Sequence, residues 1–227
     1  MNKSLLIVSL ALNLLMLSGL ILIGSRIFAE KPPVMKEVQR WTEEVPVPDN
    51  ITIAMLGNSL TAYTDWNELL GRNDVQNFGV ADFSVKQLSW LLDKWVIPSK
   101  SSFCFINGGQ EDIMLGVPLE RIAEDYSMIL DSLLHNGIKP VVQSTLMRWE
   151  DEEGNRQTER INQLIKAICK ERNIDFINLN MVLSGKNGLK PQYTTDGMHL
   201  NSKGYELWSI MLKDYLLLNN PLKTSKP

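Results

Sequence analysis

The sequence is poor in cysteine: among its 227 residues only Cys104 and Cys169 carry a thiol. Two cysteines cannot build the disulfide framework of a small secreted scaffold, and no Cys-x-x-Cys pair or Cys/His cluster indicates zinc. Both lie in apolar or amphipathic runs, which is typical of buried structural thiols. We therefore expect no metal site, and no motif predicts a cofactor.

An excess of positive charge is also missing. The chain has 23 Lys and Arg residues against 26 Asp and Glu, so its formal net charge is −3. No broad basic field exists to attract nucleic acid, and low-complexity tracts and internal repeats are absent from the sequence. With 44% hydrophobic residues the chain can bury one good core. No pattern specifies an oligomeric state.

Charge is absent altogether from Leu5 to Ile23. As a helix rising about 1.5 Å per residue, roughly twenty apolar residues reach across the ~30 Å core of a bilayer. The apolar part of a secretory signal is shorter, about 7–15 residues, and Ile27 fits poorly at position −3 of a cleavage after Ala29. We expect residues 1–28 to form an uncleaved transmembrane anchor, with a cleaved signal peptide as the alternative.

The charges around this segment give conflicting indications of topology. Four basic residues follow it between positions 26 and 40, and only Lys3 and the terminal amine precede it, which by a simple count places the main domain in the cytoplasm. However, the segment is N-terminal like an export signal, and long domains are translocated largely regardless of charge. We expect a single-pass protein of the cell membrane with its main domain extracytoplasmic, or a secreted protein if the segment is cleaved.

The rest of the chain divides into a proline-containing linker at 29–49, one domain at 50–220 and a short tail at 221–227. Within the domain, short β-rich apolar runs alternate with helical patterns. The predicted strands are 51–56, 75–80, 101–106, 139–146 and 175–180, and the predicted helices are 66–70, 84–96, 118–137, 156–173 and 202–218. This alternation predicts an α/β fold with three layers, α/β/α, around a five-stranded, mostly parallel sheet.

Two further patterns have structural interpretations. Trp90, Trp95 and Trp208 occur at helical spacing among leucines, so we expect them in the core. The charged run 149–157 is expected to be a solvated loop, although its position after the fourth strand would allow it to line the edge of a site.

Ligands of such sheets bind beyond the carboxyl ends of the strands. Three polar segments fall there, at 57–59, 77–79 and 107–112. The chain has two histidines, His135 and His199. A serine nucleophile needs a base, and the base needs a third group that holds its tautomer. His135 ends a predicted helix, where it complements the helix dipole on the surface.

His199 is therefore the candidate base, Asp196 its partner and Ser59 the nucleophile. Structural alternatives exist for each of them, since Ser59 can cap the following helix and Asp196 can form a turn. The residues alone leave these alternatives open.

Residues 50–218 resemble the SGNH (GDSL-type) serine hydrolases. That family has a Gly-Asp-Ser-Leu block after the first strand, a glycine block after the second, Gly-x-Asn-Asp after the third and Asp-x-x-His before the last helix. The corresponding residues are Gly57-Asn58-Ser59-Leu60, Gly79, Gly109-Gln110-Glu111-Asp112 and Asp196-Gly197-Met198-His199. The resemblance implies a flavodoxin-like sheet order.

The resemblance also implies roles for individual residues. Ser59 would attack an ester carbonyl, His199 would act as general base and then as acid, and Asp196 would orient His199. The backbone N–H groups of Ser59 and Gly79 would stabilise the oxyanion. Asn58 replaces the family's aspartate, a change that we expect to be tolerated because this position is outside the triad.

Glu111 is the more serious departure, because it replaces an asparagine that donates to the oxyanion. An ionised carboxylate only accepts hydrogen bonds, and its charge opposes a developing alkoxide. Four outcomes stay open: Gln110 or Asn107 supplies the donor, Glu111 is held protonated, the enzyme is slow, or the domain is inactive. Gly57, Asn58, Gly109 and Asp112 complete the blocks as supporting residues.

The resemblance implies an esterase that needs no cofactor. Given the expected outer-face location, small O-acyl or O-acetyl groups on surface carbohydrate are the favoured substrates. The alternatives are a lysophospholipase or thioesterase acting on lipid or thioester substrates, an O-acyltransferase with the same acyl-enzyme, and an inactive acyl- or glycan-binding module.

Overall fold

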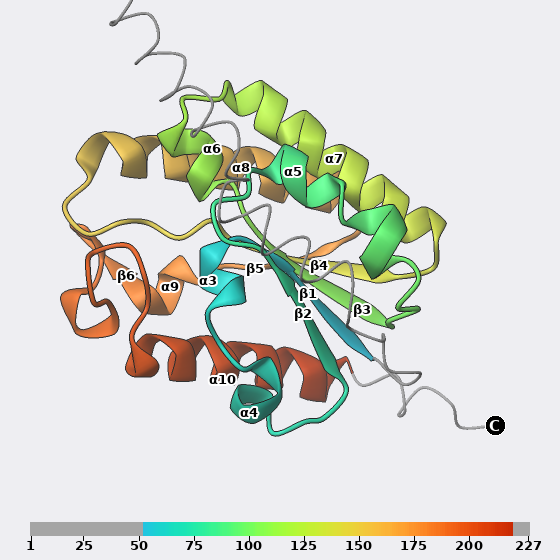
Figure 1. Cartoon of the computed structure of the whole chain (residues 1–227). Helices are drawn as coiled ribbons and strands as arrows, with labels where there is room; N and C mark the ends of the chain where they lie inside the picture. Colours follow the sequence, from blue (N-terminus) through green and yellow to red (C-terminus); the bar gives the residue numbers. More distant parts are fainter. Residues whose placement is uncertain (1–51, 220–227) are drawn as a thin grey trace, which may run out of the picture. The chain divides into compact units, whose positions relative to one another are not determined.

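The computed structural model describes residues 52–219 (Figure 1). Its centre is a parallel sheet of five strands in the order β2-β1-β3-β4-β5. The strands are β1 (Ile53–Gly57), β2 (Val75–Gly79), β3 (Phe103–Asn107), β4 (Lys139–Gln143) and β5 (Asp175–Ile177). This confirms the predicted five-stranded parallel sheet. The connections reverse direction between β1 and β3, so the carboxyl ends of these two strands flank the switch point where ligands of such sheets bind.

Helices cover both faces of the sheet (Figure 1). One face carries α5 (Val85–Ser89), α7 (Leu119–His135) and α8 (Glu152–Glu171), and the other carries α4 (Trp66–Leu70) and α10 (Ser202–Leu218). Shorter elements follow the strands: α3 (Ser59–Ala62), α6 (Gln110–Met114), α9 (Asn180–Leu183), the hairpin of β6 (Ser184–Gly185) and β7 (Gly188–Leu189), and the 3-10 turn η2 (Pro191–Tyr193). The hairpin, α9 and η2 were not predicted.

The central strands are apolar because both of their faces are covered. Every residue of β1 and β3 is buried. On the α10 side the core contains Trp208, whose ring meets that of Trp66 edge to face at 5.0 Å, and whose indole N–H donates to the side chain of Gln143. The prediction of a core position is thus confirmed for Trp208. Buried indoles need such a polar partner.

The segment 84–96 departs from the single helix expected there. It divides into α5 and a π-helical turn, η1 (Leu92–Val96). Trp90 lies between them with 63% of its surface exposed, so its predicted core position is wrong. Trp95 is partly exposed. The leucines of this segment take the inward face and leave the indole of Trp90 outside.

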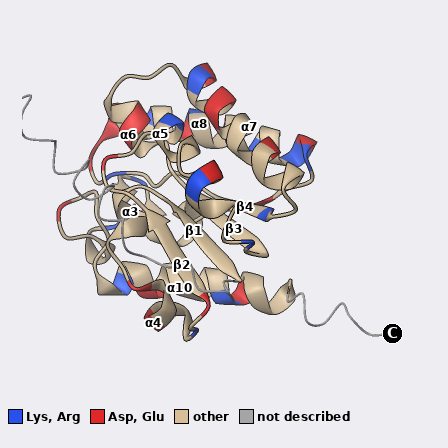
Figure 2. Cartoon of the chain, turned by 45° about the vertical axis from the view of Figure 1, so that its right-hand side comes forward, with Lys and Arg blue, Asp and Glu red and all other residues tan. Residues whose placement is uncertain are grey.

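The predicted loop at 149–157 is also only partly correct, because α8 begins at Glu152. The side chain of Asp151 accepts a hydrogen bond from the N–H of Gly154 at 3.0 Å and so caps the helix. Glu152 and Glu153 occupy its first turn, where negative charge is favourable to the helix dipole. Basic and acidic residues both occur on α7 and α8, as Figure 2 shows.

Cys104 and Cys169 are both free and buried, as expected for structural thiols. Burial raises the pKa of Cys169 to about 12, so its thiol stays protonated and unreactive. In the range 52–219 we find no helix that combines the length and apolar character required to traverse a bilayer. The predicted anchor, the linker and the tail all lie outside the described residues.

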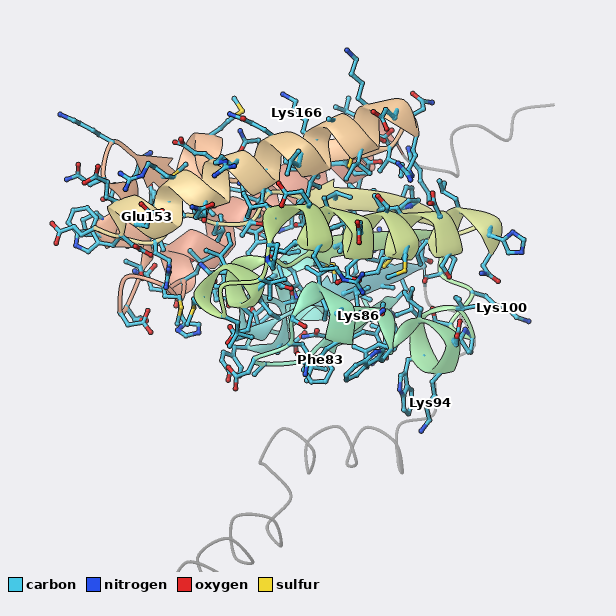
Figure 3. All side chains as sticks on the ribbon, turned by 90° about the horizontal axis from the view of Figure 1, so that it is seen from above. Phe83, Lys86, Lys94, Lys100, Glu153 and Lys166 are labelled. Carbon is cyan, nitrogen blue, oxygen red and sulfur yellow. The ribbon has the colours of Figure 1, made fainter. Side chains whose placement is uncertain are left out.

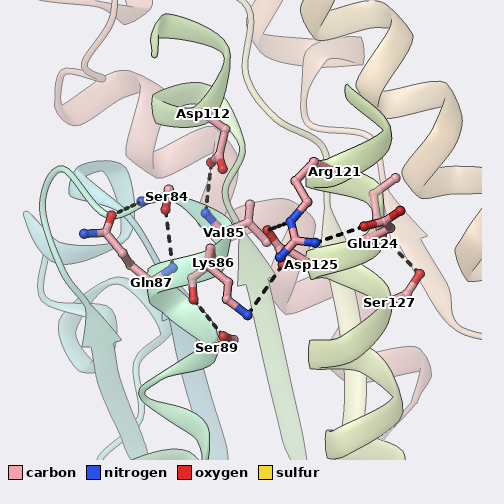
Figure 4. Close-up of polar contacts among 11 residues, drawn as sticks. Ser84, Val85, Lys86, Gln87, Ser89, Asp112, Arg121, Glu124, Asp125 and Ser127 are labelled. Carbon is pink, nitrogen blue, oxygen red and sulfur yellow. Dashed lines mark hydrogen bonds and ion pairs between the residues drawn. The ribbon is translucent and has the colours of Figure 1, made fainter. Parts of the chain in front are cut away.

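Asp112 connects α6 to the start of α5 (Figure 4). Its Oδ2 accepts the N–H of Val85 at 2.9 Å, next to the capping box formed by Ser84 and Gln87. The carboxyl group is buried, and this burial raises its pKa to about 6. Asp125, also buried, adds a like charge that acts in the same direction.

This shift predicts how stability depends on pH. Between the unfolded pKa of about 3.9 and the folded value, the native state holds a proton that the unfolded chain has lost, so the unfolding free energy falls as pH rises through this window. Asp112→Asn keeps an acceptor for Val85 and removes the charge. We expect it to raise stability by about 1–3 kcal/mol, a few degrees in Tm, above about pH 7, with the gain vanishing towards pH 4.

Thermal unfolding at several pH values measures this difference. Asp131→Asn is a control of opposite sign, because the hydrogen bond from Arg172 lowers the pKa of Asp131. Lower stability of Asp112→Asn at every pH would show that the second carboxylate oxygen makes a contact that an amide cannot replace.

Candidate active site

Ser59 lies in the turn between β1 and α3, at the carboxyl edge of the sheet. Asn58 caps α3, since its Oδ1 accepts the N–H of Leu60 at 3.2 Å. Ser59 is therefore not the helix cap, and its hydroxyl is available to a neighbour. Only glycine fits at position 57, because a Cβ there would lie 2.1 Å from Oγ1 of Thr61 and 2.5 Å from the carbonyl oxygen of Asn107.

Asp196 and His199 lie in a turn closed by several hydrogen bonds. Oδ1 of Asp196 accepts the N–H groups of Met198 at 2.9 Å and His199 at 2.7 Å, and its Oδ2 lies 2.7 Å from Nδ1 of His199. The hydroxyl of Thr194 donates to the carbonyl of His199 at 2.6 Å and accepts the N–H of Gly197 at 2.9 Å. Gly197 has φ of 88°, which suits glycine. The imidazole is thus held by its own turn.

The carboxylate of Asp196 stays ionised in this setting. Partial burial acts to raise its pKa, but the hydrogen bonds from the side chain and backbone of His199 and from the N–H of Met198 lower it to about 2. A negative charge therefore faces Nδ1 of His199 at any working pH.

The structure brings the three predicted residues together. Nε2 of His199 lies 3.3 Å from Oγ of Ser59, so the hydrogen bonds run from Ser59 through His199 to Asp196 although the chain places them 140 residues apart. The hydroxyl of Tyr205 donates to the carbonyl of Leu60 at 2.8 Å and so ties α10 to α3. Ser59 is 8% exposed, and the ring centroid of Tyr63 lies 6.0 Å from that of His199.

Gly79 does not offer the free donor expected of it. Its backbone N–H donates to Oδ1 of Asn77 at 2.8 Å, and Nδ2 of Asn77 in turn donates to the carbonyl of Thr61 at 2.9 Å. The side-chain amide of Asn77 thus links β2 to α3, and its oxygen accepts the hydrogen bond of the Gly79 N–H. The N–H of Ser59, by contrast, meets no acceptor within residues 52–219.

The two amide side chains considered as substitute donors are both engaged elsewhere. Nδ2 of Asn107 donates to the carbonyl of Ser144 at 2.9 Å, and Nε2 of Gln110 donates to that of Leu146 at 3.2 Å. Both are buried and tie the end of β3 and the start of α6 to the segment after β4. Gly109, with φ of 96°, makes the turn that begins α6.

Glu111, in the first turn of α6, lies within electrostatic range of the catalytic candidates. Partial burial raises its pKa above the ordinary value, and the negative charge of Asp82 raises it further. Arg148 and a protonated His199 act in the opposite direction. The charged neighbours of Glu111, namely Asp82, Arg148 and His199, therefore all come from other segments of the chain.

Asp82 is a site residue that the sequence reasoning missed. It has φ of 61°, the left-handed conformation that is uncommon outside glycine but tolerated by aspartate. Two residues earlier, the N–H of Val80 donates to the carbonyl of Gly57 at 2.9 Å, which brings this loop against the turn of Ser59. In the part of the chain that the structure describes, the N–H of Asp82 has no acceptor. No sequence signal marked this backbone conformation.

Trp149 begins the run 149–157, for which a position at the edge of the site was the alternative to a solvated loop. Its N–H donates to the carbonyl of Gly197 at 2.8 Å. A Cβ added to Gly197 would lie 3.3 Å from the Cβ of Trp149, so the tryptophan side chain packs against this glycine. Asn155 fixes the preceding residue, with its amide bonded to both the N–H and the carbonyl of Arg148. The segment after β4 thus supports the turn that carries His199.

Comparisons with known proteins agree with this architecture. Structural similarity extends to a GDSL-like lipase from Bacteroides thetaiotaomicron (TM-score 0.71, 20% identity, 82% of this chain and 98% of that one). It also extends to a catalytic mutant of Axe2, an acetylxylan esterase from Geobacillus stearothermophilus (TM-score 0.61, 15% identity, 70% and 91%). At these identities the likeness bears on the fold.

Two comparisons of sequence complete the assignment. The chain is 27% identical over 123 residues to an N-acylneuraminate cytidylyltransferase of Streptococcus agalactiae serotype III, which covers 53% of this chain but only 29% of that protein. Residues 49–207 match the GDSL-like lipase/acylhydrolase family, which confirms the resemblance seen in the sequence blocks. The chain therefore belongs to the GDSL-like lipase/acylhydrolase family and is an ester-hydrolysing enzyme.

Proposed function

We propose that the chain is a serine esterase with Ser59 as nucleophile, His199 as base and Asp196 as the residue that orients the base. The observation that carries this proposal is the hydrogen-bonded series Ser59–His199–Asp196, with distances of 3.3 and 2.7 Å. A serine is activated when a base within hydrogen-bonding reach is itself held in the correct tautomer.

The chemistry follows from this geometry. Nε2 of His199 takes the proton of Ser59 as Oγ attacks the ester carbonyl carbon, and the resulting imidazolium then protonates the departing alcohol. Water attacks the acyl-enzyme with His199 again as base, releasing the carboxylic acid and restoring Ser59. Asp196 stays ionised throughout, because its pKa of about 2 keeps it negative while the imidazole becomes positive.

For the oxyanion we propose the backbone N–H groups of Ser59 and Asp82. Both lack an acceptor within the described residues, and both belong to segments that meet at Gly57. Backbone donors fixed in advance stabilise a developing negative charge without reorganisation. The N–H of Gly79 would have to leave Asn77 before it could contribute.

As substrates we propose small O-acyl esters, acetyl above all, carried by carbohydrate outside the cell membrane. The printed name of one structural neighbour, an acetylxylan esterase, supports an acetylated sugar, and the name of the partly matching relative refers to an N-acylated sugar acid. The uncharged segment Leu5–Ile23 supports the membrane location.

Nitrophenyl esters of increasing chain length, assayed with the full chain in detergent, test this choice. We expect the highest kcat/KM with the acetyl ester and a decline as the acyl chain grows. A rate that rises with chain length would replace the proposal with a lysophospholipase-like activity. Transfer to a sugar hydroxyl added to the assay, at the expense of hydrolysis, would indicate an acyltransferase.

Glu111→Asn tests the carboxylate in the site. The variant removes a charge that opposes the oxyanion and restores an amide donor, so we expect kcat to rise about tenfold, less than the 10²–10³ that one such donor is typically worth. Glu120→Asn, on the exposed first turn of α7, is the matched control and should leave the rate unchanged. A clear loss of rate in Glu111→Asn, at unchanged Tm, would show that the carboxyl group has a catalytic role of its own.

A further inference from the structure

The segment from α5 to the start of β3 presents aromatic and basic side chains to solvent. Trp90 is 63% exposed, Lys94, Pro98 and Lys100 are exposed, and Trp95 is partly so. We call these five residues the α5–η1 surface. Figure 3 shows Lys94 and Lys100 on one side of the domain together with Lys86, opposite Lys166. Among the tryptophans that the structure describes, Trp90 is the one that is largely exposed, since Trp66 and Trp208 are buried and the others are partly so.

The charges of this surface are predominantly positive. Between positions 84 and 101 the chain has three lysines and a single acidic residue, Asp93. Lys86 lies 3.8 Å from the buried Asp125 on α7, which also meets Arg121 at 3.6 Å. Lys94 and Lys100 form no ion pair with any residue from 52 to 219, and the ammonium of Lys94 lies 5.2 Å from the ring centre of Trp95. Two cations are therefore free to meet an anionic partner.

We propose that the α5–η1 surface rests on the anionic headgroup layer of the membrane to which the chain is tethered. Tryptophan and lysine are the side chains favoured at membrane interfaces, since the indole enters the headgroup region while the ammonium pairs with lipid phosphate. Each lysine near such a surface adds to the attraction. A dry protein interface would instead be depleted of lysine.

The position of the surface supports this occupant. The described chain begins at Thr52, whose carbonyl accepts the N–H groups of Ser102 at 2.9 Å and Phe103 at 3.1 Å. Lys100 therefore lies two residues from Ser102, which pairs with the first residue that the structure describes. In Figure 1 the chain runs from α5, over one face of the sheet, to η1, which lies towards the amino ends of the strands.

This orientation has a consequence for the substrate, which rests on the proposed function. Ser59 and His199 lie at the carboxyl ends of the strands, at the other end of the sheet from Thr52. With the α5–η1 surface on the bilayer, the site faces away from the lipid. A surface glycan or a soluble ester can then reach Ser59, whereas the acyl chain of a lipid in the same membrane cannot.

Fluorescence quenching by brominated lipids tests the contact in the full chain, reconstituted into vesicles that contain phosphatidylglycerol. We expect the bromine-quenched fraction of the emission to fall markedly in Trp90→Phe and to be unchanged in Trp149→Phe, which removes an indole next to Gly197. Lys94→Glu combined with Lys100→Glu should lower the quenching several-fold. In vesicles of phosphatidylcholine alone the wild-type quenching should already be weak.

Flotation of the vesicles shows separately whether the chain is membrane-bound, and nitrophenyl acetate hydrolysis shows whether the site works. Quenching that Trp90→Phe leaves unchanged in floating, active protein would overturn the proposal but not the esterase. Cross-links between copies through Lys94 without quenching of Trp90 would show that the surface pairs two chains, which also overturns it. A chain that does not float overturns the membrane location as well.

Discussion

Ser59→Ala is expected to lower kcat for nitrophenyl acetate by about 10⁴- to 10⁶-fold, because it removes the atom that attacks the ester. The hydroxyl of Ser59 forms a hydrogen bond with the imidazole of His199, and Asn58 rather than Ser59 caps α3. Alanine also retains the backbone N–H proposed for the oxyanion. The variant should therefore fold and bind substrate normally, keeping only the residual rate that backbone donors and binding provide.

Initial rates with the full chain measure the loss, and a fluorophosphonate probe reports the nucleophile directly. Ser132→Ala, a partly exposed serine on α7, is the matched control and should label and hydrolyse like the wild type. Equal labelling of wild type and Ser59→Ala would rule out a serine-hydrolase mechanism through Ser59, and the domain would then be better described as a binding module. Equal Tm values show that the fold is unaffected.

The sheet could be predicted from the sequence because buried parallel strands are continuous apolar runs. The runs around Ile53 and Phe103 have no polar face to confuse the pattern, and both strands proved to be fully buried. Trp90 shows the limit of this reasoning. Helical spacing identifies a residue among leucines but does not decide on which side of a short, broken helix it lies, and only the packing of α5 against α7 does so.

The start of α8 was missed for a different reason. The run around Asp151–Glu153 was interpreted as solvated because it is charged. The same residues, however, form a helix start, with an aspartate as the cap and two glutamates in the first turn. In this case the sequence contained the signal, and charge alone was the wrong criterion.

The candidate site divides in the same way. Ser59, Asp196 and His199 were predictable because each stands in a short motif whose local hydrogen bonds fix it. Of the two oxyanion donors that we propose, the N–H of Ser59 was predicted and that of Asp82 was not, since the direction of an N–H group depends on backbone angles. Asn77 occupies the N–H of Gly79, while a left-handed Asp82 leaves its own N–H free among the described residues. The charges around Glu111 come from separate loops that only the fold brings together.

The two histidines make the sharpest test of the mechanism. His199→Gln is expected to reduce kcat by about 10⁴- to 10⁶-fold, because glutamine can form a hydrogen bond with Ser59 but cannot take its proton. His135→Gln changes the other histidine, which is exposed in the last turn of α7, and should leave kcat unchanged. A general loss in both variants would indicate a structural cause.

The double variant decides whether the residues act as a unit. If His199 works only by taking the proton of Ser59, then Ser59→Ala with His199→Gln should be no slower than Ser59→Ala alone, since the base has nothing left to activate. Additive losses would mean that His199 assists water directly and that Ser59 is not the nucleophile.

Asp196, with a pKa of about 2, remains ionised from strongly acidic to alkaline pH, so its protonation cannot limit the wild-type rate until the pH approaches that value. If the rate falls on acidification at a pH well above this value, another group in the site must cause the fall. If the fall is absent from the slow residual reaction of His199→Gln, it is assigned to the imidazole.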